Sequence, residues 1–267
     1  MIDWDDAFAN MAHVQGSEKL PEFWASRAAR YREEHKAIEQ DIPYGSSERE
    51  VFDLVMPDTK PKGLAVFVHG GFWMRLDKSY WTDLAEGARA QGWAVCIPSY
   101  TLTPEARIFE ITRQIAACIT KAAGRIDGPV RLIGHSAGGH LVTRMLCDDV
   151  SLADEVRQRI EHTISLSGLH DLRPLLHTKM NETLGLTLEE ATLESAALSL
   201  PVGQPRLTAW VGGGERPEFI RQSRLMAIMW KSFDCDTQLA IEDQHNHFTV
   251  LEALKDKNSD LVKAFIG

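Results

Sequence analysis

Short runs of consecutive apolar residues alternate with longer amphipathic stretches along most of the chain. Runs such as "GLAVFVHGG" (63–71) and "PVRLIGHS" (129–136) are almost entirely apolar, which is typical of strands buried on both faces. The same pattern predicts further strands at 93–100, 162–168, 206–214 and 237–243, with helices at 80–91, 111–123, 137–147 and 217–230 and a last helix that ends at Phe265. This alternation predicts an α/β fold with a mostly parallel central sheet covered by helices, in which ligands bind at the carboxyl ends of the strands.

Three stretches depart from the alternation. Residues 1–37 are charged, carry aromatic residues at loose helical spacing and predict a helical brace or lid. Residues 41–57 hold two short strand-like pieces around a turn. Residues 171–200 contain helical segments and no strand, which suggests an insertion over the strand ends. We therefore expect a single domain over 1–267, with a small helical cap from the N-terminal residues and this insertion.

Composition narrows the class of protein. The 267 residues are 44% hydrophobic and 25% charged, which suits one globular domain. A formal net charge of −9 without a basic stripe argues against a nucleic-acid partner. The N-terminal residues lack the pattern of a secretory signal, and no apolar run is long enough to span a membrane. Four widely spaced cysteines suit a reducing compartment, so we expect a cytoplasmic protein acting on a small molecule, with a homodimer left open.

A serine stands at one of the predicted turns from strand to helix. The stretch Gly134-His135-Ser136-Ala137-Gly138 fits the pattern G-x-S-x-G, and it follows a predicted strand and precedes a predicted helix. A turn this sharp needs small residues two positions before and after the serine. Ser136 is therefore a candidate nucleophile, whereas the alternative is a glycine-rich turn with an incidental serine.

A second glycine-containing motif ends an earlier strand. In "VFVHGGFW", the backbone N–H groups of Gly70, Gly71 and Phe72 are free to face a substrate oxygen. Together with the N–H of Ala137 at the start of the next helix, they are candidates for an oxyanion hole. The alternative is a two-glycine turn packed by Trp73.

These motifs resemble the α/β-hydrolase superfamily, and specifically its arylformamidase (kynurenine formamidase) and carboxylesterase branch. The resemblance rests on "HGGFW", "GHSAGGH", "SGLHDLRPL", "VGGGERPEFIRQS" and "HNHF", and it covers about residues 40–256. It implies the α/β-hydrolase fold. It also implies a serine hydrolase that uses no cofactor and whose substrate is N-formylkynurenine.

The catalytic base must follow the nucleophile and the acid in the chain order of this fold. His245 and His247 both follow the last predicted strand. In the family that the sequence resembles, the catalytic His directly precedes a Phe, which selects His247 before Phe248. A metal pair made of the two histidines is the other interpretation, but it lacks an obvious third ligand, so no metal is expected.

The acid that orients this histidine is expected in the loop after a late strand. Glu215 stands there, just after three glycines, and it is the first candidate. Glu218 is the second, and Asp171, which also reads as a helix cap, is the third. The alternative for both glutamates is a solvated helix N-terminus, where acidic residues are favoured in any case.

Several other residues near these motifs are candidates for the pocket. Trp73, His135 and Tyr100 are expected to contact substrate, although large aromatic residues at strand ends commonly belong to the core. His69 is expected to fix the oxyanion loop, His140 to pack within its helix, and Asn181 either to reach the substrate or to cap a turn.

Three functions are compatible with these residues. The first is an arylformamidase that releases formate from N-formylkynurenine. The second is a carboxylesterase or thioesterase for small acyl groups, which differs only in the leaving-group pocket. The third is a non-catalytic binding module, which predicts a lost catalytic residue, whereas Ser136, His247 and an acid are all present.

Overall fold

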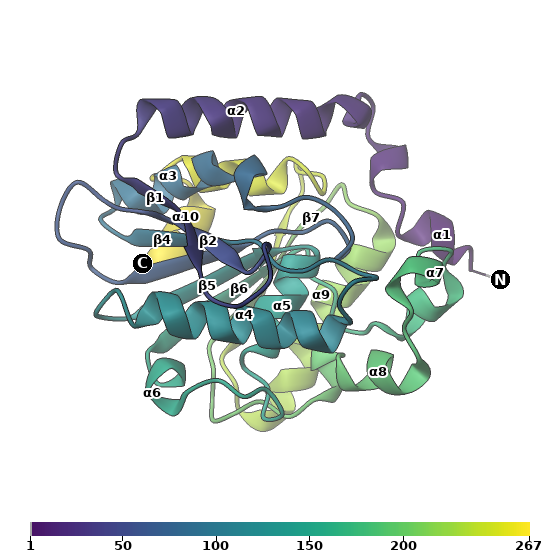
Figure 1. Cartoon of the computed structure of the whole chain (residues 1–267). Helices are drawn as coiled ribbons and strands as arrows, with labels where there is room; N and C mark the ends of the chain where they lie inside the picture. Colours follow the sequence, from purple (N-terminus) through teal and green to yellow (C-terminus); the bar gives the residue numbers. More distant parts are fainter. Residues whose placement is uncertain (1) are drawn as a thin grey trace.

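Within residues 2–267, which the computed structural model describes, an eight-stranded sheet forms the centre of the fold (Figure 1). The strands are β1 (Ile38–Pro43), β2 (Val51–Val55), β3 (Leu64–Val68), β4 (Ala94–Pro98), β5 (Val130–His135), β6 (Ile160–Leu166), β7 (Leu207–Gly212) and β8 (Thr237–Glu242). Their order across the sheet is β1-β2-β4-β3-β5-β6-β7-β8. The pairs β1 with β2 and β2 with β4 are antiparallel. The other five neighbouring pairs are parallel, which confirms the predicted mostly parallel α/β sheet.

Helices cover both faces of the sheet. One face carries α4 (Ile108–Ala123), α5 (Ala137–Arg144) and α9 (Pro217–Met229), and the other carries α2 (Leu20–Glu34), α3 (Glu86–Ala90) and α10 (Asp260–Ile266). In Figure 1, α2 and α3 lie above the sheet and α4 below it. Successive residues of a strand point to opposite faces, so Val66 and Val68 belong to the core under the first set while Ala65 and Phe67 belong to the core under the second. No helix among the described residues is long and apolar enough to cross a membrane.

The helix predicted over 80–91 is only partly correct. The segment begins as two 3₁₀ helices, η3 (Lys78–Tyr80) and η4 (Thr82–Ala85), and becomes α-helical only in α3. Trp81 separates the two turns with φ −128° and ψ 4°, which is outside the helical region. Its indole is buried against Trp24 of α2, with ring centroids 4.8 Å apart, so packing of this side chain overrides the local helical preference.

The remaining short elements lie beyond the carboxyl ends of the strands. Residues near the N-terminus form α1 (Trp4–Ala7), η1 (Met11–His13) and η2 (Ser17–Lys19), and the stretch after β6 forms η5 (Arg173–His177), α7 (Asn181–Leu184), α8 (Leu188–Leu193) and η6 (Ala196–Leu198). Figure 1 shows α1 beside α7. The two segments meet where the Asp5 carboxylate accepts a hydrogen bond from the Lys179 N–H (2.7 Å) and where the Trp4 ring stacks on His177.

Three short elements complete the described structure: α6 (Asp154–Arg157) before β6, η7 (Trp230–Phe233) after α9, and η8 (Val250–Lys255) before α10. The sequence pattern does not predict α6. It is a single turn with two acidic residues at its N-terminus and one buried side chain, so the hydrophobic period that marks longer helices is missing.

Candidate active site

Ser136 occupies the turn between β5 and α5. Its backbone has φ 56° and ψ −116°, a conformation with positive φ that is strained for a residue with a side chain. The residue is 2% exposed and its side chain borders a cavity. The turn from strand to helix therefore holds the hydroxyl in a fixed position at the N-terminus of α5, where the helix dipole favours negative charge.

The two glycines that flank this turn are required by close backbone approaches. A Cβ on Gly134 would lie 2.0 Å from the carbonyl oxygen of Gly138, and a Cβ on Gly138 would lie 2.0 Å from the carbonyl oxygen of Val68. A Cβ on Gly70 would lie 2.9 Å from the Cβ of Ser136. The loop after β3 and the turn after β5 are therefore packed directly against each other.

The loop after β3 has an unusual backbone. Gly71, Phe72 and Trp73 all have positive φ, at 111°, 52° and 57°. The Gly71 carbonyl accepts hydrogen bonds from the N–H groups of Met74 and Arg75 (3.0 and 3.1 Å), so the loop closes on itself. Ala137, the first residue of α5, has an N–H without an acceptor inside the helix. Gly70, Gly71 and Phe72 of the loop line the same cavity as Ser136.

The buried side chains of His69 and Tyr100 support this loop from the core. The His69 ring donates from Nδ1 to the Gly70 carbonyl (2.7 Å), and the Tyr100 hydroxyl donates to the His69 carbonyl (3.0 Å). Their rings stack with centroids 4.4 Å apart. Burial lowers the pKa of His69 to about 4, so the ring is neutral at pH 7 and serves as a fixed donor.

His247 and Glu215 form a buried pair beside the same cavity. The His247 Nδ1 donates to Glu215 Oε2 at 2.6 Å, and the Glu215 side chain is fully buried. Glu215 Oε1 accepts two more hydrogen bonds, from the Ser167 hydroxyl (2.5 Å) and from the Gly212 N–H (2.8 Å). These contacts fix the carboxylate, which fixes the orientation of the imidazole.

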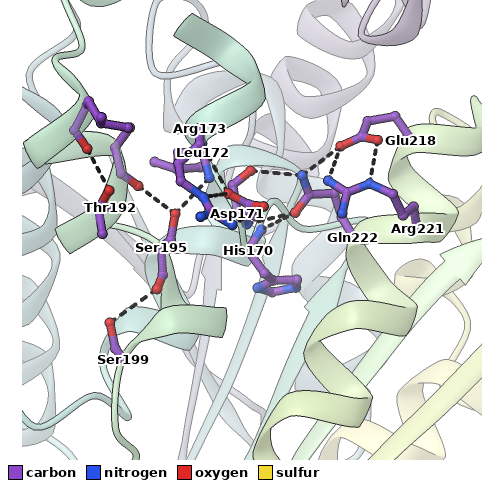
Figure 2. A network of polar contacts seen from close by, with 12 residues as sticks. His170, Asp171, Leu172, Arg173, Thr192, Ser195, Ser199, Glu218, Arg221 and Gln222 are labelled. Atoms are coloured by element: carbon purple, nitrogen blue, oxygen red, sulfur yellow. Dashed lines mark hydrogen bonds and ion pairs between the residues drawn. The ribbon is translucent and has the colours of Figure 1, made fainter. Parts of the chain in front are cut away.

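The other two acid candidates belong to a separate network (Figure 2). Glu218 accepts two hydrogen bonds from the Arg221 guanidinium (2.7 Å each) and one from the Gln222 side chain (2.8 Å). Asp171 forms a two-point ion pair with Arg173. In Figure 2, the Gln222 side chain bridges the Glu218 carboxylate and the backbone of His170 and Asp171. Neither acid has a hydrogen bond or an ion pair with His247, so Glu215 alone of the three candidates pairs with the histidine.

The other histidines near the motifs have separate partners. His245 lies at the surface and contacts Thr249 and Glu242. His140 is fully buried within α5 and donates to the Glu194 carbonyl (2.7 Å). His135 borders the cavity, and its Nε2 donates to the His247 carbonyl (2.8 Å). Burial and the neighbouring His247 lower the pKa of His135 well below its usual value, so it stays neutral. Within residues 2–267, no three His, Cys, Asp or Glu side chains are placed to hold a metal ion.

Ser136 and His247 both line a cavity of about 390 Å³. Its wall is mostly apolar, and Asp5, residues 8–12, Pro21 and Trp24 from the N-terminal segment form much of it. The aromatic lining residues are Phe8, Trp24, Phe72, Trp81 and Phe248. The sequence pattern does not single out three polar lining residues, Asp5, Asn10 and Arg75. The only signal for this wall is the aromatic spacing in residues 1–37.

Two predicted substrate contacts are wrong. Trp73 and Tyr100 are both completely buried and do not line the cavity. The Trp73 ring packs edge-on against His140, with centroids 5.1 Å apart, because the loop turns Phe72 toward the cavity and its neighbour toward the core. Asn181 also stays away from the cavity, since its side chain bonds both the carbonyl and the N–H of Leu186 and closes a turn.

Comparisons with known proteins agree with this geometry. The family model described as "Alpha/beta hydrolase family" matches residues 65–257. A kynurenine formamidase of Danio rerio is 29% identical over 237 residues, covering 85% of this chain and 80% of that protein, and one of Drosophila melanogaster is 24% identical, covering 82% and 78%. A crystal structure of a candidate thioesterase from Silicibacter sp. TM1040 is 45% identical, with a TM-score of 0.94 over the full length of both chains. Esterase B of Lactobacillus rhamnosis shares the fold, with a TM-score of 0.68 at 17% identity over 97% and 92% of the chains.

Proposed function

This chain belongs to the alpha/beta hydrolase family and is a hydrolase, and we propose that it cleaves N-aryl formamides by way of an acyl-enzyme on Ser136. The observation that carries the proposal is that Ser136 and His247 line one cavity, with Glu215 buried behind the histidine at 2.6 Å. This order of nucleophile, base and orienting acid is the one that activates a serine hydroxyl.

The proposed reaction proceeds in two steps. The Ser136 oxygen attacks the formyl carbon while His247 Nε2 takes the hydroxyl proton, and the carbonyl oxygen becomes an oxyanion that accepts hydrogen bonds from the N–H groups of Ala137 and of Gly71 or Phe72. The C–N bond then breaks, and the departing nitrogen takes the proton from His247. Water, deprotonated by His247, attacks the formyl ester and releases formate and free Ser136.

The cavity supports an aromatic leaving group. Five aromatic side chains line it, and Gly70, which also lines it, packs directly against Ser136. Phe72 crowds the oxyanion loop, which suits an acyl group as small as formyl. The kynurenine formamidases of Danio rerio and Drosophila melanogaster are relatives over most of the chain, which supports N-formylkynurenine as the substrate. The reaction uses no cofactor.

A carboxylesterase or thioesterase is the second candidate. The candidate thioesterase from Silicibacter favours it, because that protein is similar to this chain over its full length. The same serine, base and oxyanion donors serve an ester or thioester, and only the leaving atom differs. The leaving group therefore decides between the two candidates.

We further propose that the protein is cytoplasmic and that it can form a homodimer. All four cysteines are free and buried, and the sulfurs of Cys96 and Cys118 lie 3.9 Å apart without a bond, which supports a reducing compartment. Gel filtration with light scattering tests the homodimer.

The deciding experiment compares hydrolysis of N-formylkynurenine with hydrolysis of short-chain p-nitrophenyl esters and acyl thioesters. The enzyme, Ser136→Ala and the control Ser223→Ala, which removes another buried serine hydroxyl, are measured in parallel. A higher kcat/KM for the formamide, lost only in Ser136→Ala, supports the arylformamidase. Turnover of esters or thioesters without the formamide refutes the substrate and favours the second candidate.

A further inference from the structure

The imidazole of His135 lies beside the reacting groups but takes no part in the proposed reaction. The residue is the last of β5 and directly precedes Ser136. It is 5% exposed, and it lines the cavity that also contains Ser136 and His247. In a mostly apolar wall, a buried polar ring is one of the few groups that can fix the orientation of a bound molecule.

The backbone fixes the tautomer of His135. Its Nε2 lies 2.8 Å from the His247 carbonyl oxygen, and a carbonyl oxygen only accepts hydrogen bonds, so Nε2 carries the ring proton. Burial and the neighbouring His247 also lower the pKa of His135 well below its usual value, so the ring binds no second proton at pH 7. Nδ1 therefore has a free lone pair and acts as an acceptor only.

This Nδ1 atom is open to the cavity. Within residues 2–267 it has no hydrogen-bond partner, and it is not enclosed by protein atoms. The Nδ1 atoms of His140 and His170 also lack a partner, but both are enclosed. The His135 Nδ1 lies 3.3 Å from the position that a Cβ on Gly70 would occupy. The acceptor is thus placed next to the loop that would bind the carbonyl oxygen of a substrate.

The scissile bond of a bound substrate would lie close to this acceptor. In the proposed reaction the leaving atom takes its proton from His247, while the carbonyl oxygen lies at the loop that contains Gly70. The His135 ring is beside both, because its centroid is 4.6 Å from that of the His247 ring and its Nδ1 is at Gly70. The leaving atom of a secondary amide carries a hydrogen, whereas that of an ester or a thioester does not.

We propose that His135 Nδ1 accepts a hydrogen bond from the N–H of the scissile amide and thereby makes the site selective for amides over esters. The inference rests on the proposed function and deepens it, because it names the residue that distinguishes the first candidate substrate class from the second. It also restricts the formamides to those with a hydrogen on nitrogen.

The hydrogen bond has a chemical purpose in amide cleavage. When Ser136 attacks, the nitrogen lone pair is no longer shared with the carbonyl group, and it must point toward His247 to take the proton. Binding the N–H to His135 fixes the direction of this lone pair in the transition state. The hydrogen stays on nitrogen throughout, so the arylamine leaves with one hydrogen of its own and one from His247. An ester oxygen has two lone pairs and does not need this contact.

Two substitutions separate the two nitrogens of the ring. His135→Gln keeps an N–H group at the position of Nε2, where it can donate to the His247 carbonyl, and has no acceptor at the position of Nδ1. His135→Asn does the reverse, because its amide oxygen can occupy the position of Nδ1 while its side chain is too short to reach the carbonyl. His245→Gln is the control, since this nearby histidine lies outside the cavity. Urea unfolding verifies the fold of each variant.

Matched substrates isolate the N–H group. Formanilide is compared with N-methylformanilide, in which a methyl group replaces the hydrogen, and with phenyl formate, in which oxygen replaces the whole N–H group. The readout is the ratio of kcat/KM for formanilide to kcat/KM for each of the other two. Since kcat/KM reports the steps up to release of the leaving group, the water that later attacks the acyl-enzyme does not affect it.

A second readout needs no formamide turnover. Formanilide and N-methylformanilide are measured as competitive inhibitors of p-nitrophenyl acetate hydrolysis, and the Ki of the second is divided by the Ki of the first. This Ki ratio reports the hydrogen bond to the N–H in the bound amide.

We expect His135→Gln to lower both kcat/KM ratios and the Ki ratio by roughly 10-fold, the size of one hydrogen bond. We expect His135→Asn to keep all three ratios within a few-fold, and the control to keep them as well. Equal losses in the Gln and Asn variants would mean that the contact with the His247 carbonyl causes the effect, which overturns the proposal.

The outcomes separate this inference from the proposed function. Formamide hydrolysis with kcat/KM ratios that His135→Gln leaves unchanged overturns the role of His135 and keeps the arylformamidase. If no formamide is hydrolysed, the arylformamidase is overturned. A Ki ratio that falls in His135→Gln then keeps the hydrogen bond to the amide, whereas a Ki ratio that does not change overturns both proposals.

Discussion

Replacing Glu215 by Gln tests the catalytic arrangement at its most buried contact. The side chain keeps its size, and its amide oxygen can still accept from the Ser167 hydroxyl and the Gly212 N–H, which now bond Oε1 at 2.5 and 2.8 Å. That orientation turns the amide NH₂ group toward His247 Nδ1, where the carboxylate oxygen now accepts at 2.6 Å.

The consequence for the histidine is a change of tautomer. A donor facing Nδ1 forces the ring proton onto Nε2, and an Nε2 that already carries a proton cannot take one from Ser136. The variant also lacks the negative charge that stabilises the imidazolium form. We expect kcat to fall on the order of 10⁴-fold, which corresponds to about 5.4 kcal/mol of lost transition-state stabilisation. The packing is preserved, so the free energy of unfolding changes little by comparison.

The measurement is kcat and kcat/KM for whichever substrate the enzyme turns over best, with urea unfolding to verify the fold. Glu218→Gln is the matched control, because this glutamate lies three residues further on but bonds Arg221 and Gln222. We expect that control to retain activity within a few-fold. Retention of a tenth or more of the rate in Glu215→Gln, or a larger loss in Glu218→Gln, would refute the assignment of the acid.

Three further outcomes follow from the structure. Ser136→Ala is expected to abolish turnover and covalent labelling by a phosphonate ester while leaving the fold intact; labelling that persists in mass spectra contradicts the assignment. Gly138→Ala puts a Cβ 2.0 Å from the Val68 carbonyl oxygen, so urea titrations should show a free energy of unfolding lower by about 1–3 kcal/mol or more. In the control Gly124→Ala, the nearest atom to the new Cβ is 3.5 Å away, and the free energy of unfolding should hardly change. Burial lowers the pKa of His69 to about 4 and the pKa values of His140 and His170 to about 3, so the unfolded chain takes up these protons below about pH 6.5 while the folded protein does not. The free energy of unfolding should therefore fall from pH 6.5 to pH 4, by about 1.4 kcal/mol per pH unit for each histidine. Urea titrations at pH 7, 6 and 5 that give the same free energy of unfolding would contradict this prediction.

Much of the fold could be predicted from the sequence because the strands are buried on both faces. Near-continuous apolar runs such as 64–68 and 130–135 are typical of such strands, and their alternation with helices specifies a parallel sheet. The segment around Trp81 could not be predicted, because its two 3₁₀ turns depend on packing against Trp24, more than fifty residues away in the chain. Local propensity contains no information about such a contact.

Some residues of the candidate site could likewise be predicted from the sequence, and others could not. Ser136 can be found from a local motif, because the steric demands of the turn fix the residues on either side of it. The prediction for Trp73 is wrong because its neighbour Phe72 borders the cavity, and which of the two does so depends on the left-handed backbone of the loop. Asp5 and Asn10 carry no signal in the sequence, since the contact that places Asp5 joins residues 174 positions apart.

The origin of the cavity wall has a consequence for how relatives of this protein can diverge. The residues that carry the proposed chemistry project from the ends of the central strands, where almost any change disturbs the core. The stretch from Asp5 to Trp24 contributes much of the cavity wall but no strand and none of the proposed catalytic groups. Mutations there can alter which molecules enter while the reaction and the fold persist. Selection for new substrates is thus expected to act first on this stretch, and exchanging it between relatives is a direct route to enzymes with altered substrate range.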